Sequence, residues 1–135
     1  MAEMLQGATI GILGGGQLGR MLSMAAARLG HRCHVYDPGV APAADVAAAH
    51  TRAAWDDEAA LAAFARGCDV VTYEFENVPP QTAEIVAAHA PLRPGLTPLV
   101  TAQDRLAEKR FLADLGLATA PFAAVDGPGD LAAAL

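Results

Sequence analysis

The feature that most constrains the fold of this chain is a glycine-rich segment, GILGGGQLGRM, which joins an apolar run to an Ala-rich stretch. Residues 10–13 have the composition of a buried strand, and the stretch that ends at Gly30 favours a helix. Gly14, Gly16 and Gly19 match the pattern G-x-G-x-x-G, in which glycine allows a tight turn, a close approach of ligand to backbone, and close packing of helix on strand. The segment therefore predicts a strand, a turn and a helix whose N-terminus can face a ligand.

Arg20 lies in the first turn of this expected helix, where its positive charge opposes the helix dipole. An anionic or oxygen-rich ligand beside the turn would relieve that conflict. A side chain that extends into solvent would also avoid it. Both interpretations stay open from the sequence, because the glycine pattern alone identifies no ligand.

Strand-like and helix-like segments alternate along the chain, a pattern typical of a parallel sheet with crossover helices. Further strands are expected in four places: residues 32–37, 50–54 and 68–77, and a short segment around Leu92. Helices are expected after Asp56 and Asp57, either of which can act as a cap, and after Asn77 with its following prolines. We therefore expect an α/β fold with a doubly wound, mostly parallel sheet of Rossmann-like type.

The organisation of the sequence changes at residues 94–98, which are rich in proline and glycine. Residues 101–116 are predicted to form one amphipathic helix. Thr101 would be its N-cap, Asp104 lies at the capping-box distance, and Gly116 would end it.

Two domains are expected, a substrate-binding domain over residues 1–98 and a truncated second region over residues 99–135. The second region would contain the helix just described, a short extended segment, and a further helix over residues 128–135 capped by Asp130. Because the sequence ends within that last helix, with no stop signal after its start, we expect the chain to be the front piece of a longer protein.

Composition narrows the classes of partner. With a net charge of −6 and only nine scattered Lys and Arg, the chain lacks the basic surface of a protein that binds nucleic acid or an anionic membrane. No apolar run approaches the length of a membrane span and the N-terminal sequence shows no signal-peptide pattern, so we expect a cytoplasmic protein with small-molecule partners. Cys33 and Cys68 lack a CxxC spacing and the four histidines lack ligand spacing, so no metal site is expected.

Acidic side chains follow two of the expected strands, where doubly wound sheets bind ligands. In the strand expected over residues 68–77, Glu74 and Glu76 are two residues apart and would point to the same side. Asp37 ends the second strand and would approach the same crevice, where it suits a dinucleotide ribose, but the further acids would repel a pyrophosphate. Acids match the ribose hydroxyls and amino group of a smaller nucleotide. In the competing interpretation, one glutamate only caps a helix or faces solvent.

Three segments in order, GILGGGQLGRM, YEFENVP and QDRLAEKRFL, resemble the N-terminal portion of the N5-carboxyaminoimidazole ribonucleotide synthetase family, the ATPase subunit of phosphoribosylaminoimidazole carboxylase. The resemblance covers nearly the whole chain, and its specificity comes from the ordered combination. It implies a pre-ATP-grasp domain followed by the start of an ATP-grasp region. It also implies the family's reaction in purine biosynthesis, in which ATP and bicarbonate carboxylate the exocyclic amine of 5-aminoimidazole ribonucleotide through carboxyphosphate.

The same resemblance implies roles for individual residues. Backbone N–H groups of the turn would border the aminoimidazole ribonucleotide, at Gly16, Gln17 and Leu18. Asp37 and Glu74 would contact the ribose or the amine, with Glu76 in reserve.

Arg105 matches a position that contacts ATP in the family, although an exposed pair with Glu108 would explain it equally simply. Lys109 is expected on a solvated face or at the domain junction. ATP and magnesium are expected in the parent enzyme, with the magnesium ligands beyond Leu135. No cofactor is expected to bind tightly to this chain alone, which should therefore be inactive.

Three alternatives are weighed against this resemblance. A glycinamide ribonucleotide transformylase-like ATP-grasp enzyme shares the general plan, but its family usually has an acid where this chain has Gln17. The dinucleotide-binding domain of a reductase would share the glycines, but Glu74 and Glu76 argue against it. A non-catalytic interaction domain stays open, and so does the oligomeric state, a homodimer included.

Overall fold

The structure is a computed structural model that describes residues 6–134, with side chains described as far as residue 131. Residues 1–5, which belong to the segment searched for a signal peptide, and Leu135, the end of the expected last helix, lie outside the described residues. The chain divides into two compact units, Met1–Leu99 and Val100–Leu135. Within the described part, no helix is long and apolar enough to span a membrane.

Four parallel strands form one sheet in the first unit, in the order β3-β2-β1-β4. Their bounds are Thr9–Leu13 for β1, Arg32–Tyr36 for β2, Ala49–Thr51 for β3 and Val70–Tyr73 for β4. Leu13 pairs with Tyr36 on one side and with Tyr73 on the other, so three strands end at the same level. The predicted α/β fold with a parallel sheet is confirmed.

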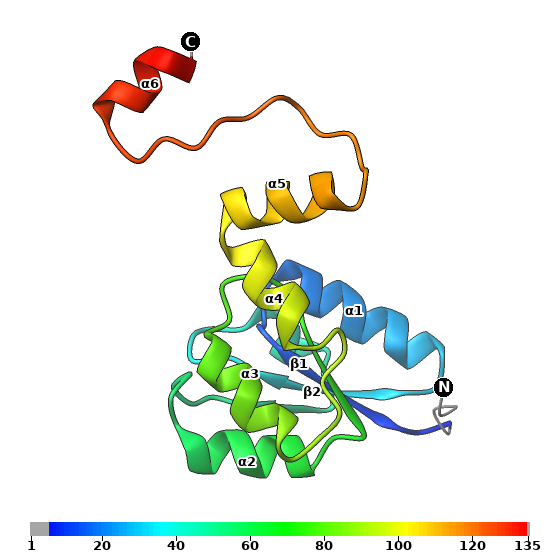
Figure 1. Cartoon of the computed structure of the whole chain (residues 1–135). Coiled ribbons are helices and arrows are strands. Elements are labelled where there is room, and N and C mark those ends of the chain that lie inside the picture. Colours follow the sequence, from blue (N-terminus) through cyan, green and yellow to red (C-terminus); the bar gives the residue numbers. More distant parts are fainter. Residues whose placement is uncertain (1–5, 135) are drawn as a thin grey trace. The chain divides into compact units, whose positions relative to one another are not determined.

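Helices lie on both faces of this sheet (Figure 1). On one face lies α1, with a short 3-10 helix, η1, beside it; on the other face lie α2 and α3. Their bounds are Gln17–Arg28 for α1, Pro42–Asp45 for η1, Glu58–Arg66 for α2 and Pro80–Ala87 for α3. The remaining helices are α4 (Leu96–Gln103), α5 (Arg105–Asp114) and α6 (Pro128–Ala134).

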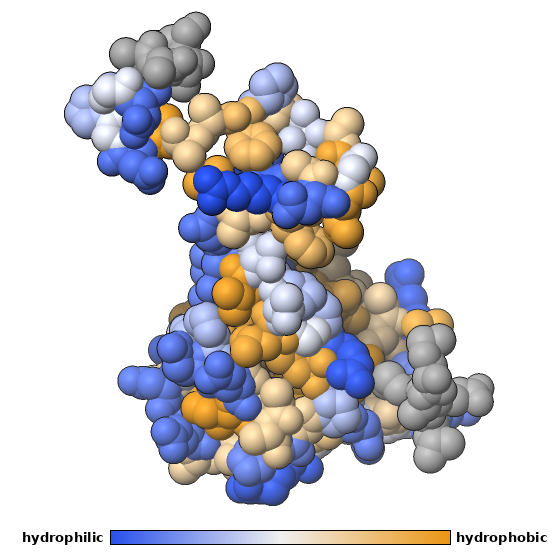
Figure 2. Space-filling view, viewed as in Figure 1, coloured by the Kyte–Doolittle hydropathy of each residue, from blue (hydrophilic) through white to orange (hydrophobic). Residues whose placement is uncertain are grey.

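Two apolar clusters fill the space between the sheet and its helices. Because successive side chains of a strand point to opposite faces, Ile12 of β1 packs with Ala26 of α1, while Leu13 packs with Leu61 and Phe64 of α2. In the second unit the large apolar side chains are more exposed, and hydrophobic residues are visible on its surface in Figure 2. The first unit therefore contains the core that positions the candidate site.

The strand predicted over residues 68–77 is wrong at its end, because β4 stops at Tyr73 and residues 74–77 bend into a turn. The partner of Tyr73, Leu13, is the last residue of β1, and the chain turns away at Gly14, which has a φ of +104°, so the ladder does not continue. The fifth strand expected around Leu92 is reduced to an isolated bridge with Val71.

The single helix predicted over residues 101–116 is also wrong. The structure has two helices there, and Thr101 lies inside the first of them. Asp104 has an extended backbone, and its carboxylate accepts the N–H of Ala107 at 2.7 Å, so it caps a new helix. The stop at Gly116 is confirmed, since its φ of +74° is a conformation that favours glycine.

Two expected caps differ in outcome. Asp57, and not Asp56, caps α2 by accepting the N–H of Ala60 at 3.0 Å. Asp130 lies within the first turn of α6 and accepts the N–H groups of Asp126 and Gly127. Asp130 therefore binds the backbone that enters the helix. It was predicted as the cap, but it lies inside the helix, which begins at Pro128.

Candidate functional site

The candidate site lies where β1, β2 and β4 end. The strand order reverses beside β1, and doubly wound sheets bind ligands outside the carboxyl ends of the strands at such a point. The N–H of Gly14 donates to the carbonyl of Tyr36, and the N–H of Glu74 donates to the carbonyl of Leu13. These bonds fix the turn after β1 against the residues that follow β2 and β4.

Glycine is required in this turn for steric reasons. Gly14 has a φ of +104°, and a Cβ there would lie 2.5 Å from Cγ of Glu74. A Cβ on Gly19 would lie 2.9 Å from the carbonyl oxygen of Gly14, so this glycine lets α1 pack against the turn. The predicted roles of glycine in turning the chain and in packing helix on strand are confirmed.

Two carboxylates of the chain itself accept the N–H groups of the turn. Gly16 donates to Oε1 of Glu74 at 3.0 Å, and Gly15 donates to Oδ2 of Asp37 at 2.8 Å. In a dinucleotide-binding domain, these N–H groups would face a pyrophosphate. A pyrophosphate here would have to displace both acids and would be repelled by them, which disfavours a dinucleotide.

The two acids differ in the acceptor capacity they keep. Asp37 uses both oxygens on backbone N–H groups, since Oδ1 also accepts from Gly39 at 2.7 Å. Glu74 uses Oε1 on Gly16, and within residues 6–131 its Oε2 accepts no hydrogen bond. Asp37 therefore holds the turn against the loop after β2, whereas Glu74 keeps an oxygen for a ligand.

Glu76 differs from this pair in its exposure, since Asp37 and Glu74 are half-buried. It is exposed and lies in the turn at residues 74–77, so strand alternation does not apply to it. The basis on which the two glutamates were expected to point to the same side is therefore wrong. The structure brings Glu74 and Asp37 to the glycine turn.

The start of α1 completes the turn. Gly16 is the N-cap and supplies no side-chain acceptor, so the N–H groups of Gln17 and Leu18 belong to the open end of a helix. Both side chains are exposed. These N–H groups can meet an electronegative group of a ligand beside Oε2 of Glu74.

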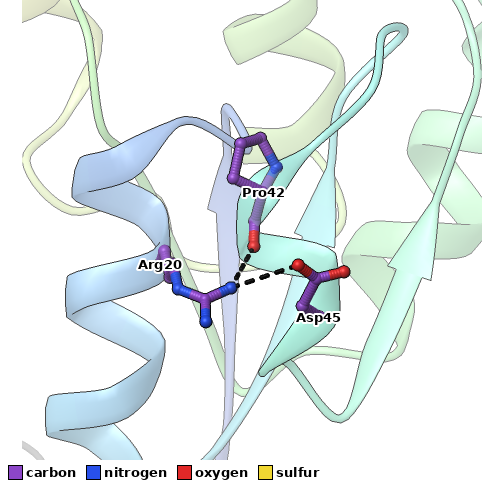
Figure 3. A network of polar contacts seen from close by, with 3 residues as sticks. All are labelled: Arg20, Pro42 and Asp45. Atoms are coloured by element: carbon purple, nitrogen blue, oxygen red, sulfur yellow. Dashed lines mark hydrogen bonds and ion pairs between the residues drawn. The ribbon is translucent and has the colours of Figure 1, made fainter.

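Arg20 has a partner that neither sequence interpretation named. Its Nη1 donates to the carbonyl of Pro42 at 3.0 Å and to Oδ2 of Asp45 at 3.2 Å (Figure 3). Both side chains are partly or largely exposed, so the ion pair contributes little energy. It ties α1 to η1 and keeps the arginine away from the helix N-terminus.

A surface hollow of about 580 Å³ is lined in part by Pro38, the residue after Asp37, and sequence analysis missed it. Six of its lining residues are Pro38, Trp55, Asp56, Pro79, Thr82 and Ile85. Tyr36 lies beneath Trp55, with ring centroids 5.6 Å apart, and burial, followed by the charges of Asp57 and Asp56, raises the pKa of Tyr36 to about 12. The sole tryptophan, in the loop after β3, was the available signal.

Arg105 forms an exposed ion pair with Glu108 within α5, as the simpler interpretation has it. Arg105 and Lys109 also line a hollow of about 280 Å³ in the second unit, together with Phe122. Nζ of Lys109 lies 5.9 Å from the centroid of the Phe122 ring. Among the described residues, no group of three or more His, Cys, Asp or Glu is placed to hold a metal ion.

Known proteins resemble this chain over nearly its whole length. A family described as the ribonucleotide synthetase preATP-grasp domain matches residues 7–103. The N5-carboxyaminoimidazole ribonucleotide synthase of Brucella melitensis is 51% identical over 130 residues, which are 96% of this chain and 36% of the relative. That of Staphylococcus aureus strain MRSA252 is 40% identical over 126 residues, 93% of this chain and 34% of the relative.

Solved structures of proteins with the same synthase name also superpose on this chain. The ADP complex of an N5-carboxyaminoimidazole ribonucleotide synthetase superposes with a TM-score of 0.90 at 40% identity, over 99% of this chain and 36% of that one. A synthase of Aspergillus clavatus, in complex with ADP and 5-aminoimidazole ribonucleotide, superposes with a TM-score of 0.79 at 33% identity. That match covers 97% of this chain and 36% of the synthase. This chain therefore spans little more than a third of the length of these relatives.

Proposed function

Because the chain belongs to the ribonucleotide synthetase preATP-grasp domain family, as its three sequence segments predict, we propose that it is the substrate-binding front part of an ATP-dependent ligase. The ligase would carboxylate 5-aminoimidazole ribonucleotide with bicarbonate to N5-carboxyaminoimidazole ribonucleotide, in purine biosynthesis. Relatives that carry this synthase name are 40% and 51% identical to the chain. We also propose that the ligase uses magnesium with its ATP, takes bicarbonate as a substrate and works in the cytoplasm. A homodimer is compatible with this proposal.

The observation that carries this proposal is the pair of carboxylates on the glycine turn. Gly15 and Gly16 give their N–H groups to Asp37 and Glu74, so the turn offers an acceptor, Oε2 of Glu74, where a dinucleotide domain offers donors. Ribose hydroxyls and an exocyclic amine are donors, and they match such oxygens. The dinucleotide hypothesis is disfavoured for the same reason.

This geometry supports a role for each of the expected substrate-binding residues. Glu74 would accept a hydrogen bond from the ribose or the amine at Oε2, while its Oε1 stays on Gly16. The N–H groups of Gln17 and Leu18, at the open start of α1, would face electronegative atoms of the ribonucleotide. Asp37 would position the turn, and Glu76 would contribute less because it is exposed beyond the strand end.

ATP would meet the second unit at Arg105. The donor set there fits phosphate, because Arg105 and Lys109 line one hollow and a guanidinium can donate two parallel hydrogen bonds. The Phe122 ring gives this hollow an apolar wall, against which a base can pack. When bound, ATP supplies the phosphoryl group that activates bicarbonate. In this role Arg105 would leave its ion pair with Glu108 and bind the nucleotide instead.

The proposal is tested with a chimaera in which this chain replaces the matched third of the Brucella melitensis relative. We expect phosphate release from ATP to depend on 5-aminoimidazole ribonucleotide in the chimaera, and to be absent from the 135-residue chain alone. A folded chimaera that binds ATP but shows no such dependence would contradict the proposed substrate. Turnover by the 135-residue chain alone would show that the remaining length is not needed.

A further inference from the structure

Glu74 lies in a turn, residues 74–77, that an aromatic side chain ties to the rest of the first unit. That side chain belongs to Phe75, which is half-buried and packs against the apolar core. Both side chains lie against Gly14, because a Cβ on that glycine would lie 2.5 Å from Cγ of Glu74 and 2.9 Å from Cδ1 of Phe75. The acid and the ring therefore rest on the same point of the glycine turn.

The ring of Phe75 also contacts the ring of Trp55. The two ring centroids lie 6.2 Å apart, and the ring planes are tilted by 53°. Aromatic pairs at this spacing attract each other through their quadrupoles, in addition to the apolar area that they bury. Since Trp55 lies in the loop after β3, the pair joins that loop to the turn after β4.

Trp55 is held in place from two further elements. Thr82, fully buried in α3, donates from its hydroxyl to the carbonyl of Trp55 at 2.5 Å. Tyr36, at the end of β2, lies beneath the Trp55 ring, and its hydroxyl donates to the carbonyl of the residue before Trp55. The carbonyl of Tyr36 in turn accepts the N–H of Gly14. The contacts close a circuit, because Phe75 returns from Trp55 to Gly14.

We propose that Phe75 and Trp55 are positioning residues for Glu74, whose Oε1 they keep on the N–H of Gly16 and whose Oε2 they keep open to a ligand. A displacement of about 1 Å in such a group is enough to weaken its contacts severely, so the turn that carries it has to be fixed. The consequence for the substrate rests on the proposed function, whereas the hold on Glu74 does not depend on it. In the simpler alternative the two rings only fill the core, and their loss would lower stability without a specific effect on Glu74.

The first test follows the amide of Gly16 in the isotope-labelled chain, without any ligand. Phe75→Leu removes the ring but keeps an apolar side chain on the core, so the first unit should stay folded. We expect the Gly16 amide resonance to shift and its hydrogen exchange to accelerate about three- to tenfold, the factor that corresponds to the free energy of one aromatic pair. Trp55→Leu should have the same effect, and the two substitutions together should add little to either alone.

Two further variants are the controls. Ile85→Ala removes apolar contacts from the same core cluster but lies outside the circuit, so it should change the exchange of the Gly16 amide by less than about twofold. Phe75→Tyr keeps the ring, and since Phe75 is half-buried the added hydroxyl can reach water; it should behave as the unchanged chain does. An unchanged Gly16 amide in Phe75→Leu would overturn the proposal, and so would an equal response to Ile85→Ala.

The second test carries Phe75→Leu into the chimaera, with and without Glu74→Gln. Alone, it should raise the KM for 5-aminoimidazole ribonucleotide about three- to tenfold and leave kcat and the KM for ATP little changed. In the Glu74→Gln background it should add less than about twofold, because the acid through which it acts is gone. Equal factors in the two backgrounds would overturn the proposal. A chimaera without activity dependent on 5-aminoimidazole ribonucleotide would reject the proposed substrate, whereas the response of the Gly16 amide would still support the positioning of Glu74.

Discussion

The N–H of Gly16 donates a 3.0 Å hydrogen bond to Oε1 of Glu74, a residue 58 positions further along the chain. This contact joins the turn after β1 to the turn after β4, across the point where the strand order reverses. It also leaves Oε2 of Glu74 beside the open N-terminus of α1. The proposed division of roles between the acids follows from this contact.

Glu74→Gln in the chimaera should raise the KM for 5-aminoimidazole ribonucleotide by roughly ten- to a hundredfold, with the KM for ATP little changed. The glutamine oxygen can still accept the N–H of Gly16, so the turn keeps its shape while the charged acceptor for the substrate is lost. Steady-state phosphate release measures both constants.

Glu76→Gln is the matched control, because Glu76 lies two residues away and is exposed. It should change either KM by less than about threefold, as expected for a surface substitution. A silent Glu74→Gln with a crippling Glu76→Gln would reverse the two assignments. If neither substitution changes the KM for 5-aminoimidazole ribonucleotide, the substrate does not bind at the end of β4.

Asp37→Asn should destabilise the first unit by about 1–3 kcal/mol, because asparagine has one acceptor oxygen and cannot serve both Gly15 and Gly39. Chemical denaturation measures the loss, and faster hydrogen exchange at one of the two glycine amides locates it. The control Asp45→Asn removes only an exposed ion pair and should cost no more than about 0.5 kcal/mol. Equal effects of the two substitutions would argue against Asp37 as the residue that holds the turn.

The local features of the fold were predictable because each depends on neighbouring residues. The turn at Gly14 and Gly19 follows from backbone sterics, and the ending at Gly116 follows from a positive φ. The end of β4 was not predictable, since it depends on where β1 stops pairing. Pro91 and Pro94 flank Leu92 and lack N–H donors, which is why only a bridge forms there.

The site was predicted in its residues and not in its contacts. Strand ends identified Asp37 and Glu74, but only the folded chain brings their oxygens onto the N–H groups of Gly15 and Gly16. The pair of Arg20 with Asp45 is equally non-local. Thr101 was predicted as the N-cap of one helix with Asp104 at the capping-box distance, whereas Asp104 is the N-cap of a second helix.

Asp57→Ala should lower the free energy of unfolding by about 1 kcal/mol, because it removes the cap of α2. α2 buries Leu61 and Phe64 in the core, so fraying at its start is transmitted to the whole unit. Asp56→Ala, one residue earlier, should stay within about 0.5 kcal/mol of the unchanged chain. Urea denaturation of both variants checks the assignment, which fails if Asp56→Ala is the more costly of the two.

Stability should fall as the pH drops below about 6.5, and His34 should account for part of the slope. Burial, followed by the charge of His50, lowers the pKa of His34 in the folded chain, so the unfolded chain binds a proton more readily. The contribution is present above the unfolded pKa and is lost below it. His34→Gln should flatten the dependence between pH 7 and 5, whereas the exposed control His89→Gln should not. An unchanged slope in His34→Gln would contradict this origin.

The central claim is that the glycine turn binds a ribonucleotide at Oε2 of Glu74 and at the N–H groups of Gln17 and Leu18, and does not bind the pyrophosphate of a dinucleotide. Its most direct test follows the amide chemical shifts of Gly15, Gly16, Gln17 and Leu18 in the isotope-labelled chain during titration with 5-aminoimidazole ribonucleotide, NAD and NADP. We predict that the ribonucleotide shifts these amides, at concentrations up to about 1 mM, and that neither dinucleotide gives a saturable response. Saturable micromolar binding of NAD or NADP, with no response to the ribonucleotide, would contradict the account.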